Sequence, residues 1–299
     1  MTTGLTVMKC GGAAGVDPGR VCADVAALVA AGERVVLVHG GSAELDKLAA
    51  RLGVPQRTLT SRSGVTSRYT DDATLEVLTL ALAGQVKPAV LTELAALGVP
   101  AVGMTGIDAG LLRARRKQAL RAKVDGRVVL VRDDHSGRID RVEPGVLKVL
   151  LDSGITPVVS PPALDEDGRS VNVNADRVAT AVAAALGATR LIFLTAAPGV
   201  LADPRDPSSR LDHVVLPPEG TPPGAEGGMA VKLIAAREAL VAGVPEVLIA
   251  DGRVERPVRR AIAGEATRAV LGVPEHNGAA GAPDAADGTP STPNGEGDE

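Results

Sequence analysis

Short apolar runs alternate with longer amphipathic stretches along most of this chain. The runs at residues 6–8, 35–38, 101–104, 156–159, 191–194 and 247–249 are typical of strands. The stretches between them include residues 21–31, 45–52, 73–83 and 175–186, which have the apolar spacing of helices. This order predicts an α/β protein, a three-layer αβα sandwich with a mainly parallel central sheet.

Two further features modify this scheme. Residues 127–131 and 139–142, separated by 132–138, predict an inserted β-hairpin. The character of the sequence changes near residue 170, so we predict two lobes with a cleft between them, at residues 1–170 and 171–271. Residues 272–299 are rich in Gly, Pro, Ala and Asp and are predicted to form a disordered acidic tail. That tail is either an extension without a role or a modulator of partner binding.

Composition narrows the possible partners and the compartment. The formal net charge is −4, but residues 272–299 hold six acidic and no basic residues, so the remainder carries +2. One Tyr, one Phe and no Trp leave few rings for base stacking, so we expect no nucleic-acid partner. Cys10 and Cys22 have no metal-ligand spacing, which favours a reducing compartment. No leader and no apolar segment of about 18 residues is apparent, so we expect a cytoplasmic protein without a membrane segment.

Three glycine-bearing turns carry the candidate chemistry. They are Lys9-Cys10-Gly11-Gly12, His39-Gly40-Gly41-Ser42 and Gly227-Gly228-Met229-Ala230-Val231-Lys232. The first two follow predicted strands, at the sheet edge where open α/β sheets bind ligands. Glycine lets backbone N–H groups approach phosphate oxygens, a helix N-terminus adds partial positive charge, and lysine adds a full charge. Because the chain has only seven lysines against 25 arginines, two lysines among three turns indicate a phosphate site built from distant segments.

Polar residues at two predicted helix starts each allow two interpretations. In Ser67-Arg68-Tyr69-Thr70-Asp71, Thr70 or Asp71 is a candidate helix cap, while Arg68 suits a carboxylate held by two hydrogen bonds. In Asn172-Val173-Asn174-Ala175-Asp176, Asn174 is a candidate cap and Asp176 complements the helix dipole. The same side chains also offer amides to a substrate and a carboxylate that positions lysines.

A basic run at residues 113–117 is followed by Arg121 and Lys123. It is either a solvated face or a docking patch for an acidic partner.

Several common chemistries have no motif in this sequence. The P-loop, the Gly-x-Gly-x-x-Gly dinucleotide fingerprint and Gly-x-Ser-x-Gly are absent. The four histidines, His39, His135, His213 and His276, are scattered, and none has a partner at metal-ligand spacing. What remains is phosphate chemistry carried by backbone amides and positive charges.

Taken together, these motifs resemble the amino-acid kinase family, and within it the acetylglutamate kinase group. The resemblance runs from Thr6 to about Leu271. It depends on the ordered set Lys9-Cys-Gly-Gly12, His39-Gly-Gly41, Arg68-x-Thr-Asp71, Asn172-x-Asn-x-Asp176, Ala197-Pro-Gly199 and Gly228-Met-x-x-Lys232. It implies a carbamate kinase-like fold with two lobes. It also implies an enzyme that transfers the γ-phosphate of ATP to a substrate carboxylate, which gives an acyl phosphate.

The resemblance implies a role for each matched residue. Lys9 and Lys232 would stabilise the transferring phosphoryl group, and Asp176 would hold both lysines. The implied phosphate-binding residues are Gly11, Gly12 and Ser42; the substrate-binding residues are Gly40, Gly41, Arg68, Asn172 and Asn174; the nucleotide-binding residues are Ala197, Gly199 and Met229. ATP and Mg²⁺ would bind together, without metal ligands from the protein. Because a carboxylate is already ionised at pH 7, the reaction needs no general base.

Details of the motifs resemble one branch of this group. His39-Gly-Gly-Ser42-Ala-Glu44, Ser67-Arg-Tyr-Thr-Asp71 and Ala114-Arg-Arg-Lys117 are similar to kinases of lysine biosynthesis. These phosphorylate 2-aminoadipate while its amino group is attached to a small acidic carrier protein of the LysW type. The resemblance therefore implies a carrier partner, docked on the basic run, and a homodimer.

Two alternatives remain open from the sequence. The first is a kinase of N-acetylglutamate or carrier-linked glutamate in arginine biosynthesis, because one methylene is worth only about 1–3 kcal/mol in a pocket. The second is a non-catalytic nucleotide-sensing protein. The sequence departs from the lysine branch at Gly227-Gly-Met, where Gly-Arg-Met is usual, and at Gly264-Glu-Ala-Thr267, where Ala266 replaces a glycine. Neither departure touches Lys9, Asp176 or Lys232, so we expect an active kinase.

Overall fold

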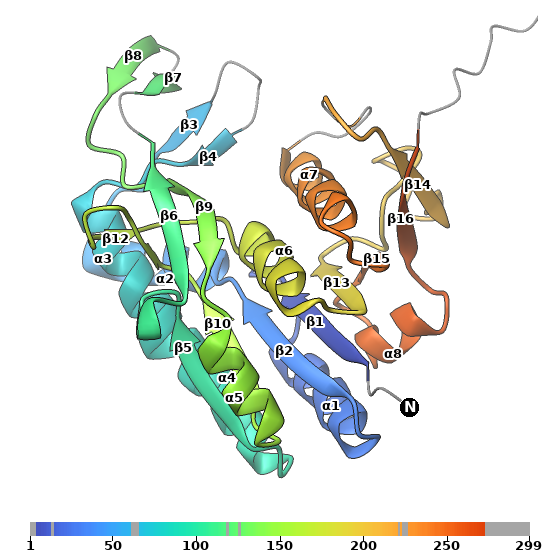
Figure 1. Ribbon diagram of the computed structural model, residues 1–299. Helices are drawn as coiled ribbons and strands as arrows, with labels where there is room; N and C mark the ends of the chain where they lie inside the picture. Colours follow the sequence, from blue (N-terminus) through green and yellow to red (C-terminus); the bar gives the residue numbers. More distant parts are fainter. Residues whose placement is uncertain are drawn as a thin grey trace, which may run out of the picture.

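One eight-stranded sheet forms the centre of the molecule (Figure 1). The computed structural model describes residues 4–12, 15–60, 66–117, 120–124, 127–220, 222 and 227–272. The strand order across this sheet is β14 (His213–Leu216), β16 (Thr267–Leu271), β15 (Glu246–Asp251), β13 (Arg190–Thr195), β1 (Leu5–Cys10), β2 (Arg34–His39), β10 (Thr156–Ser160) and β5 (Ala101–Thr105). All neighbours are parallel except β15 and β16. The mainly parallel sheet is therefore confirmed.

Helices cover both faces of this sheet. The α-helices of the described residues are α1 (Pro18–Ala30), α2 (Ser42–Leu52), α3 (Asp72–Ala81), α4 (Lys87–Ala96), α5 (Gly145–Asp152), α6 (Ala175–Leu186), α7 (Gly227–Val241) and α8 (Pro257–Ile262), and all but α2 and α3 pack on this sheet. On one face α1, α4 and α8 pack around Met8 and Leu37. On the other face α5, α6 and α7 pack around Val7, Val38 and Phe193. The chain is therefore the three-layer αβα sandwich that the apolar pattern predicts.

The six predicted strands are all present, and so are the four predicted helices. Two strands of the central sheet, β14 and β16, were missed. Their runs mix exposed and buried residues because they lie at or next to an edge of the sheet.

A continuous helical segment, here called the rod, packs against α2 at one end and against the central sheet at the other. It consists of α3, a π-helix at Leu82–Val86, and α4. Before the π-helix, Val77 and Leu78 pack against α2; after it, Val90 and Leu94 pack against the sheet. The wider π-turn changes which side of the rod is buried. By length and composition alone, the rod Asp72–Ala96 could cross a membrane. The expectation that no apolar segment is long enough to do so was therefore wrong. Buried side chains of the rod belong to two packed apolar clusters.

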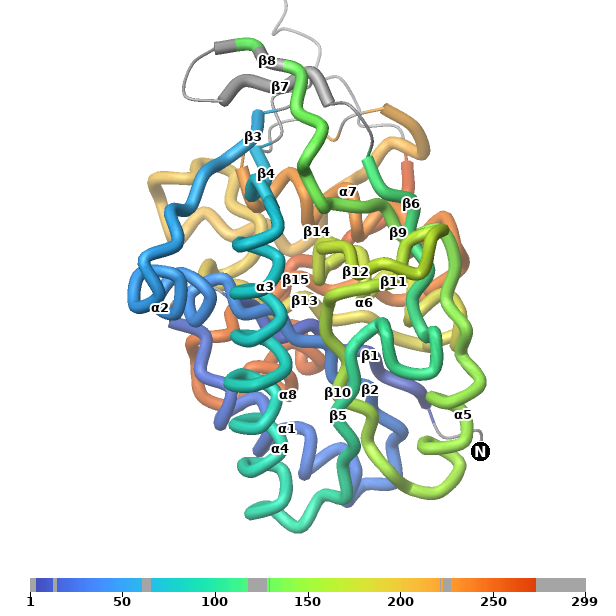
Figure 2. The backbone as a smooth tube through the Cα atoms, turned by 90° about the vertical axis from the view of Figure 1, so that its left-hand side faces the viewer, coloured from blue at the N-terminus to red at the C-terminus, as the bar shows by residue number. Residues whose placement is uncertain are grey.

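Two four-stranded sheets flank the central sheet (Figures 1 and 2). One contains β4 (Thr66–Arg68), β3 (Thr58–Thr60), β7 (Leu120–Val124) and β8 (Arg127–Val131). The other contains β12 (Ser170–Val171), β11 (Ala163–Leu164), β6 (Leu112–Arg116) and β9 (Gly137–Val142). The predicted hairpin of β8 with β9 is wrong, because β8 pairs with β7 and β9 with β6. The chain between β8 and β9 is bound to other segments and crosses from one sheet to the other.

Strands from both predicted lobes join the same central sheet. β1 from the first half pairs with β13 from the second. The predicted boundary near residue 170 coincides with β12, and the division into lobes remains a prediction. The predicted tail beyond Gly272 lies outside the described residues, as do the side chains of Arg121 and Lys123.

Candidate functional site

The carboxyl ends of β1 and β2 lie side by side at one edge of the central sheet. Cys10 is paired in register with His39 in these parallel strands. The two glycine-bearing turns that follow are therefore adjacent, at the edge where ligands of α/β sheets bind.

Gly12 packs directly against the second turn. A β-carbon on Gly12 would lie 2.2 Å from the amide nitrogen of Gly41 and 2.7 Å from that of Ser42. The Gly12 carbonyl accepts hydrogen bonds from Ser42 Oγ at 2.7 Å and from the Ala43 amide at 2.9 Å. Ser42 thus joins the two turns, and Gly12 lies against the amino end of α2.

Two of the neighbouring glycines, Gly11 and Gly41, also have no room for a side chain. A β-carbon on Gly11 would lie 2.8 Å from the Leu194 carbonyl oxygen, and one on Gly41 would lie 2.5 Å from Leu82 Cδ2. Gly40 has more room, with Gly12 N at 3.5 Å. The two turns form a compact backbone surface that side chains would disrupt.

The His39 side chain is hydrogen-bonded to the backbone of this surface. Its ring is buried, and Nδ1 donates to the Gly40 carbonyl at 2.9 Å. Within the described part of the chain, Nε2 has no hydrogen-bond partner. Burial lowers the pKa of His39 to about 4, although the bond to Gly40 opposes that shift. The ring is therefore neutral at pH 7.

Two lysines from opposite ends of the sequence meet on one carboxylate. Lys9 Nζ lies 2.9 Å from Asp176 Oδ1, and Lys232 Nζ lies 3.1 Å from Asp176 Oδ2. All three side chains are at most 14% exposed. Burial opposes ionisation of Asp176, but the two lysines outweigh it and hold the pKa of Asp176 below its usual value. Burial also lowers the pKa of Lys232. With all three ionised, the cluster carries one surplus positive charge, which suits an anionic ligand.

Two helix starts bring the second half of the chain to this cluster. Asp176 lies in the first turn of α6, and Asn174 caps that helix by accepting from the amides of Asp176 at 2.9 Å and Arg177 at 3.2 Å. The side-chain oxygen of Asn174 is therefore used by the helix. Lys232 lies in α7, which begins at Gly227 and carries the partly buried Met229 in its first turn.

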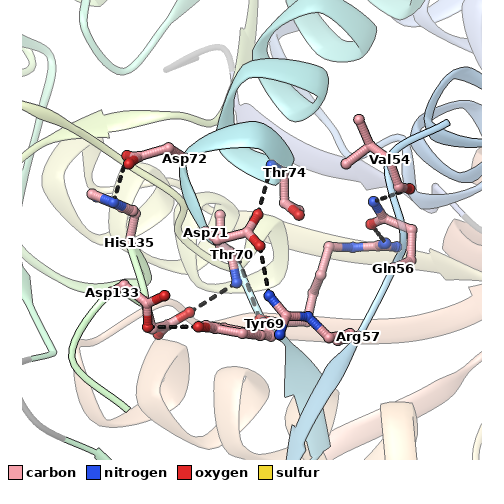
Figure 3. Close-up of polar contacts among 12 residues, drawn as sticks. Val54, Gln56, Arg57, Tyr69, Thr70, Asp71, Asp72, Thr74, Asp133 and His135 are labelled. Atoms are coloured by element: carbon pink, nitrogen blue, oxygen red, sulfur yellow. Dashed lines mark hydrogen bonds and ion pairs between the residues drawn. The ribbon is translucent and has the colours of Figure 1, made fainter. Parts of the chain in front are cut away.

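Arg68 is already bound at both of its terminal nitrogens. Nη2 lies 2.8 Å from Asp46 Oδ1 of α2, and Nη1 donates to Gln56 Oε1. Asp71, two residues after Tyr69, caps α3 by accepting from the Thr74 amide at 2.9 Å and also binds Arg57 at 2.7 Å (Figure 3). The cap at Asp71 is thus confirmed. Asp46 and Gln56 were missed by the sequence analysis, since no pattern connects them with Arg68.

Asn172 and Thr70 join the two halves of the chain. Asn172 Nδ2 donates to Thr70 Oγ1 at 3.1 Å, across a separation of 102 residues. Thr70 Oγ1 in turn lies 3.4 Å from the Arg68 carbonyl, to which it donates. Arg68 and Asn172 are therefore connected through one hydroxyl group.

The loop at Ala197, Pro198 and Gly199 follows β13 and is fixed to β16. The Val200 amide donates to Thr267 Oγ1 at 3.0 Å, and a β-carbon on Gly199 would lie 2.6 Å from that oxygen. Ala266, the departure noted in the sequence, is buried and has no positive φ, so the turn accommodates its side chain. Pro198 also lines a cavity of about 190 Å³ with Arg210 and Arg260.

The basic run at residues 113–117 is not a uniform surface. Arg115 is exposed and pairs with Asp140 at 3.1 Å. Arg116 instead donates from Nε to the Asp134 carbonyl at 3.1 Å, inside the structure. Nearby, a groove of about 450 Å³ between β9 and α6 is lined by three arginines, Arg138, Arg141 and Arg177, and by two acidic residues, Asp140 and Glu238.

In the described ranges, no group of three or more His, Cys, Asp and Glu side chains is placed to hold a metal ion. Both oxygens of Asp176 face lysines. A Mg²⁺ ion is commonly held by substrate phosphates and water with few protein ligands, so this donor set fits a metal that arrives with a nucleotide.

Comparison with known proteins adds an independent line of evidence. The family model described as "Amino acid kinase family" matches residues 4–251. A LysW-aminoadipate kinase of Deinococcus radiodurans is 39% identical over 264 residues, which cover 88% of this chain and 90% of that protein. An acetylglutamate kinase of Methanocella arvoryzae is 36% identical over 258 residues, covering 83% of each.

Among solved structures, the carbamate kinase of Giardia superposes with a TM-score of 0.61. The match covers 91% of this chain and 100% of that chain at 15% sequence identity, and it is a likeness of fold.

Proposed function

Because this chain belongs to the amino acid kinase family, we propose that it phosphorylates the side-chain carboxylate of amino-protected 2-aminoadipate with ATP. The product is an acyl phosphate. The observation that carries this proposal is the buried cluster of Lys9, Asp176 and Lys232 beside the two glycine turns. Such a cluster supplies fixed positive charge without a general base, which is what transfer to an ionised carboxylate needs.

The mechanism follows from the charges. A carboxylate oxygen of the acceptor bonds to the γ-phosphorus of ATP while the bond to the β,γ-bridging oxygen breaks, and ADP leaves with that electron pair. No proton moves, because the acceptor is ionised at pH 7. Lys9 and Lys232 stabilise the charge that spreads over the phosphoryl oxygens, and Asp176 keeps their ammonium groups in place.

Backbone groups complete the phosphate end of the proposed site. The amides near Gly11, Gly12 and Ser42 lie at the joined turns, where α2 adds the partial positive charge of its amino end. Gly40 and Gly41 border the reacting carboxylate. Mg²⁺ bound to the nucleotide would neutralise phosphate charge.

At the other end, Arg68 and Asn172 bind the α-carboxylate and the amide of the protected acceptor. Asn172 Nδ2 is engaged by Thr70, which leaves Oδ1 as an acceptor for a substrate N–H. Asn174 contributes with its amide nitrogen, since its oxygen caps α6. Ala197, Gly199 and Met229 bind the nucleotide on the second lobe.

The acceptor is proposed to arrive on a small acidic carrier. The support is the similarity to the LysW-aminoadipate kinase together with exposed Arg115 and the arginine-lined groove. We further propose a cytoplasmic homodimer with the substrate in residues 1–170 and the nucleotide in residues 171–271. The dimer is testable by sedimentation of the purified chain.

A second candidate function is favoured by a specific observation. The acetylglutamate kinase at 36% identity matches over most of both chains. That candidate predicts efficient turnover of free N-acetylglutamate, whereas the carrier-dependent kinase predicts slow turnover of any free acceptor. A nucleotide-sensing protein would bind ATP without acyl phosphate formation.

The first experiment measures ATP-dependent acyl phosphate, trapped as the hydroxamate. The acceptors are N-acetylglutamate, N-acetyl-2-aminoadipate, and the carrier-linked forms of glutamate and aminoadipate. We expect turnover to be fastest with carrier-linked aminoadipate. The Lys9→Met variant should abolish the signal and Lys47→Met, on exposed α2, should retain it. Fastest turnover of free N-acetylglutamate would instead assign the chain to the second function.

A further inference from the structure

A buried carboxylate outside the lysine cluster holds the acceptor end of the site together. Asp134 is 1% exposed and lies in the connection between β8 and β9. Its Oδ1 accepts from the Thr70 amide at 2.9 Å, and its Oδ2 accepts from the Ser136 hydroxyl. Within the described residues, no cation lies in salt-bridge range of this carboxylate. A buried carboxylate held by neutral donors is costly to retain, so its role needs an explanation.

Residues 134–137, here called the clamp, are bound on two sides. On one side the His135 amide donates to the Thr70 carbonyl at 2.7 Å. On the other side the Asn172 amide donates to the His135 carbonyl, and the Gly137 amide donates to the Asn172 carbonyl, each at 2.8 Å. The clamp therefore lies between the segment that carries Arg68 and the segment that carries Asn172.

Side chains next to the clamp reinforce this attachment. His135 Nε2 lies 2.7 Å from Asp72 Oδ1 at the start of α3, and Tyr69 donates to Asp133 at 2.5 Å (Figure 3). Arg116 Nε donates to the Asp134 carbonyl from β6. Contacts from α3 and β6, together with the bond from Tyr69 to the residue before the clamp, thus fix the clamp relative to Thr70.

Thr70 transmits this position to both proposed acceptor contacts. It is completely buried. Its amide binds Asp134, and its hydroxyl accepts from Asn172 Nδ2 and donates to the Arg68 carbonyl. Loss of the Asp134 carboxylate would leave the Thr70 amide unpaired in the interior, and Thr70 would shift to find a partner. Such a shift would rotate the side-chain amide of Asn172 and would at the same time displace Arg68.

We propose that Asp134 is a positioning residue that sets the spacing of Arg68 and Asn172 and thereby the affinity for the acceptor. This inference rests on the proposed function, because it uses those two residues as acceptor contacts. Asp134 does not touch the acceptor in this account. It acts through Thr70, so its effect belongs to the KM of the acceptor rather than to the KM of ATP.

The test compares steady-state kinetics of matched variants with carrier-linked aminoadipate. Asp134→Ala should raise the KM of the acceptor about tenfold or more and leave the KM of ATP unchanged. Asp134→Asn keeps an oxygen for the Thr70 amide and should restore most of the affinity. The control is Asp24→Ala, because Asp24 is also buried and accepts from two amides, Val258 at 2.7 Å and Arg259 at 3.2 Å, at the start of α8. It should lower the melting temperature without changing the acceptor KM.

A second pair of variants covers the case in which Asp134→Ala does not fold. Thr70→Val keeps the shape and the amide of Thr70 but removes the oxygen that Asn172 binds, so it should raise the acceptor KM as well. Thr70→Ser should restore it. An acceptor KM that is unchanged in Asp134→Ala, or in Thr70→Val where Asp134→Ala does not fold, overturns the inference while the kinase activity stands. A KM that rises equally in Asp24→Ala overturns it as well. Absence of acyl phosphate formation by the unsubstituted enzyme overturns the proposed function, and the inference with it.

Discussion

At the scale of single residues, the main feature of the site is a buried cluster that carries one surplus positive charge. Lys9 and Lys232 share one carboxylate, and neither lysine is free to be solvated by bulk water. Burial makes such an arrangement expensive unless an anion completes it. The surplus positive charge therefore supports the phosphoryl-binding role that we propose for the cluster.

Replacement of Lys232 tests this charge balance. In Lys232→Met the shape is nearly kept, but one of the two lysines that we propose to stabilise the transferring phosphoryl group is removed. We expect kcat to fall roughly 10²–10³-fold, with the acceptor KM within about threefold. Lys47→Met removes an exposed lysine that pairs with Glu44 and should behave as the unsubstituted enzyme. A change in KM with kcat retained would contradict the role in the transition state.

Asp46 places a negative charge beside the proposed carboxylate-binding arginine. In Asp46→Asn an oxygen remains for Arg68 Nη2, while the charge that would repel the acceptor is removed. Because exposed charge pairs are worth about 0.2–1 kcal/mol, we expect the acceptor KM to fall about 1.4- to fivefold with kcat unchanged. Initial-rate kinetics measure this. A higher KM would mean that Asp46 orients Arg68 instead of competing for it.

His39 links the site to the pH dependence of stability. Its folded pKa of about 4 lies below the unfolded value near 6.5, so the unfolded chain binds the extra proton between these limits. The stability that the neutral ring contributes is present above pH 6.5 and is lost as pH falls toward 4. We expect this term to change by about 2 kcal/mol in urea unfolding between pH 7 and pH 4.5, measured against His39→Gln. Parallel losses in the two proteins would show that His39 does not titrate in this way.

At the scale of elements, the contact between the two turns sets the shape of the phosphate end. Gly12 lies against the backbone of Gly41 and Ser42, which cannot move away without breaking the start of α2. By contrast, Gly84 in the π-helix has nothing within 4 Å of a β-carbon. Packing therefore requires a glycine at position 12 and leaves room for a side chain at position 84.

This contrast yields a matched pair of substitutions. Gly12→Ala should abolish activity and lower the melting temperature, because its β-carbon would lie 2.2 Å from a backbone nitrogen. Gly84→Ala should keep activity and stabilise the protein by about 0.5–1 kcal/mol through reduced freedom of the unfolded chain. Thermal unfolding and the hydroxamate assay read out both. An active, stable Gly12→Ala protein would show that the turns are not rigidly joined.

At the scale of the whole molecule, charge is divided between the described body and the C-terminal residues. The chain carries −4 overall, although residues 272–299 contribute six acidic residues. Strands β6 and β9 carry Arg115, Arg138 and Arg141, whose positive charges would attract an acidic carrier. Association through such charges weakens with salt.

The salt dependence of turnover tests the carrier proposal. Between about 50 and 300 mM salt, the KM of carrier-linked aminoadipate should rise several-fold, because the shorter screening length weakens docking. The KM of free N-acetyl-2-aminoadipate should change much less. Arg115→Ala should reduce the salt effect for the carrier-linked substrate. Equal salt effects on the two acceptors would argue against docking on this face.

Much of the fold could be predicted because it depends on local pattern. The strands at residues 35–38 and 191–194 are continuous apolar runs, and burial on both faces of a parallel sheet requires that pattern. The cap at Asp71 and the helix start at Asn174 follow from short-range backbone bonding. The predicted pairing of β8 with β9 was wrong. The connection between these strands is held by hydrogen bonds to Thr70 and Asn172, which are distant in the sequence, and no local pattern reveals such contacts.

The sequence by itself determined the central αβα layers, the glycine turns and the identity of the charged groups, because these depend on residue type and spacing within a few positions. The family resemblance implied that Asp176 holds Lys9 and Lys232, and the structure shows both ion pairs. Only the tertiary structure decided that Asp46 meets Arg68 and that Asp134 lies beneath Thr70. The contacts of Asp46 with Arg68 and of Lys9 with Asp176 join residues that are 22 and 167 positions apart. Their formation depends on how strands are ordered in the sheet and how loops are anchored, and that order is a property of the packed molecule.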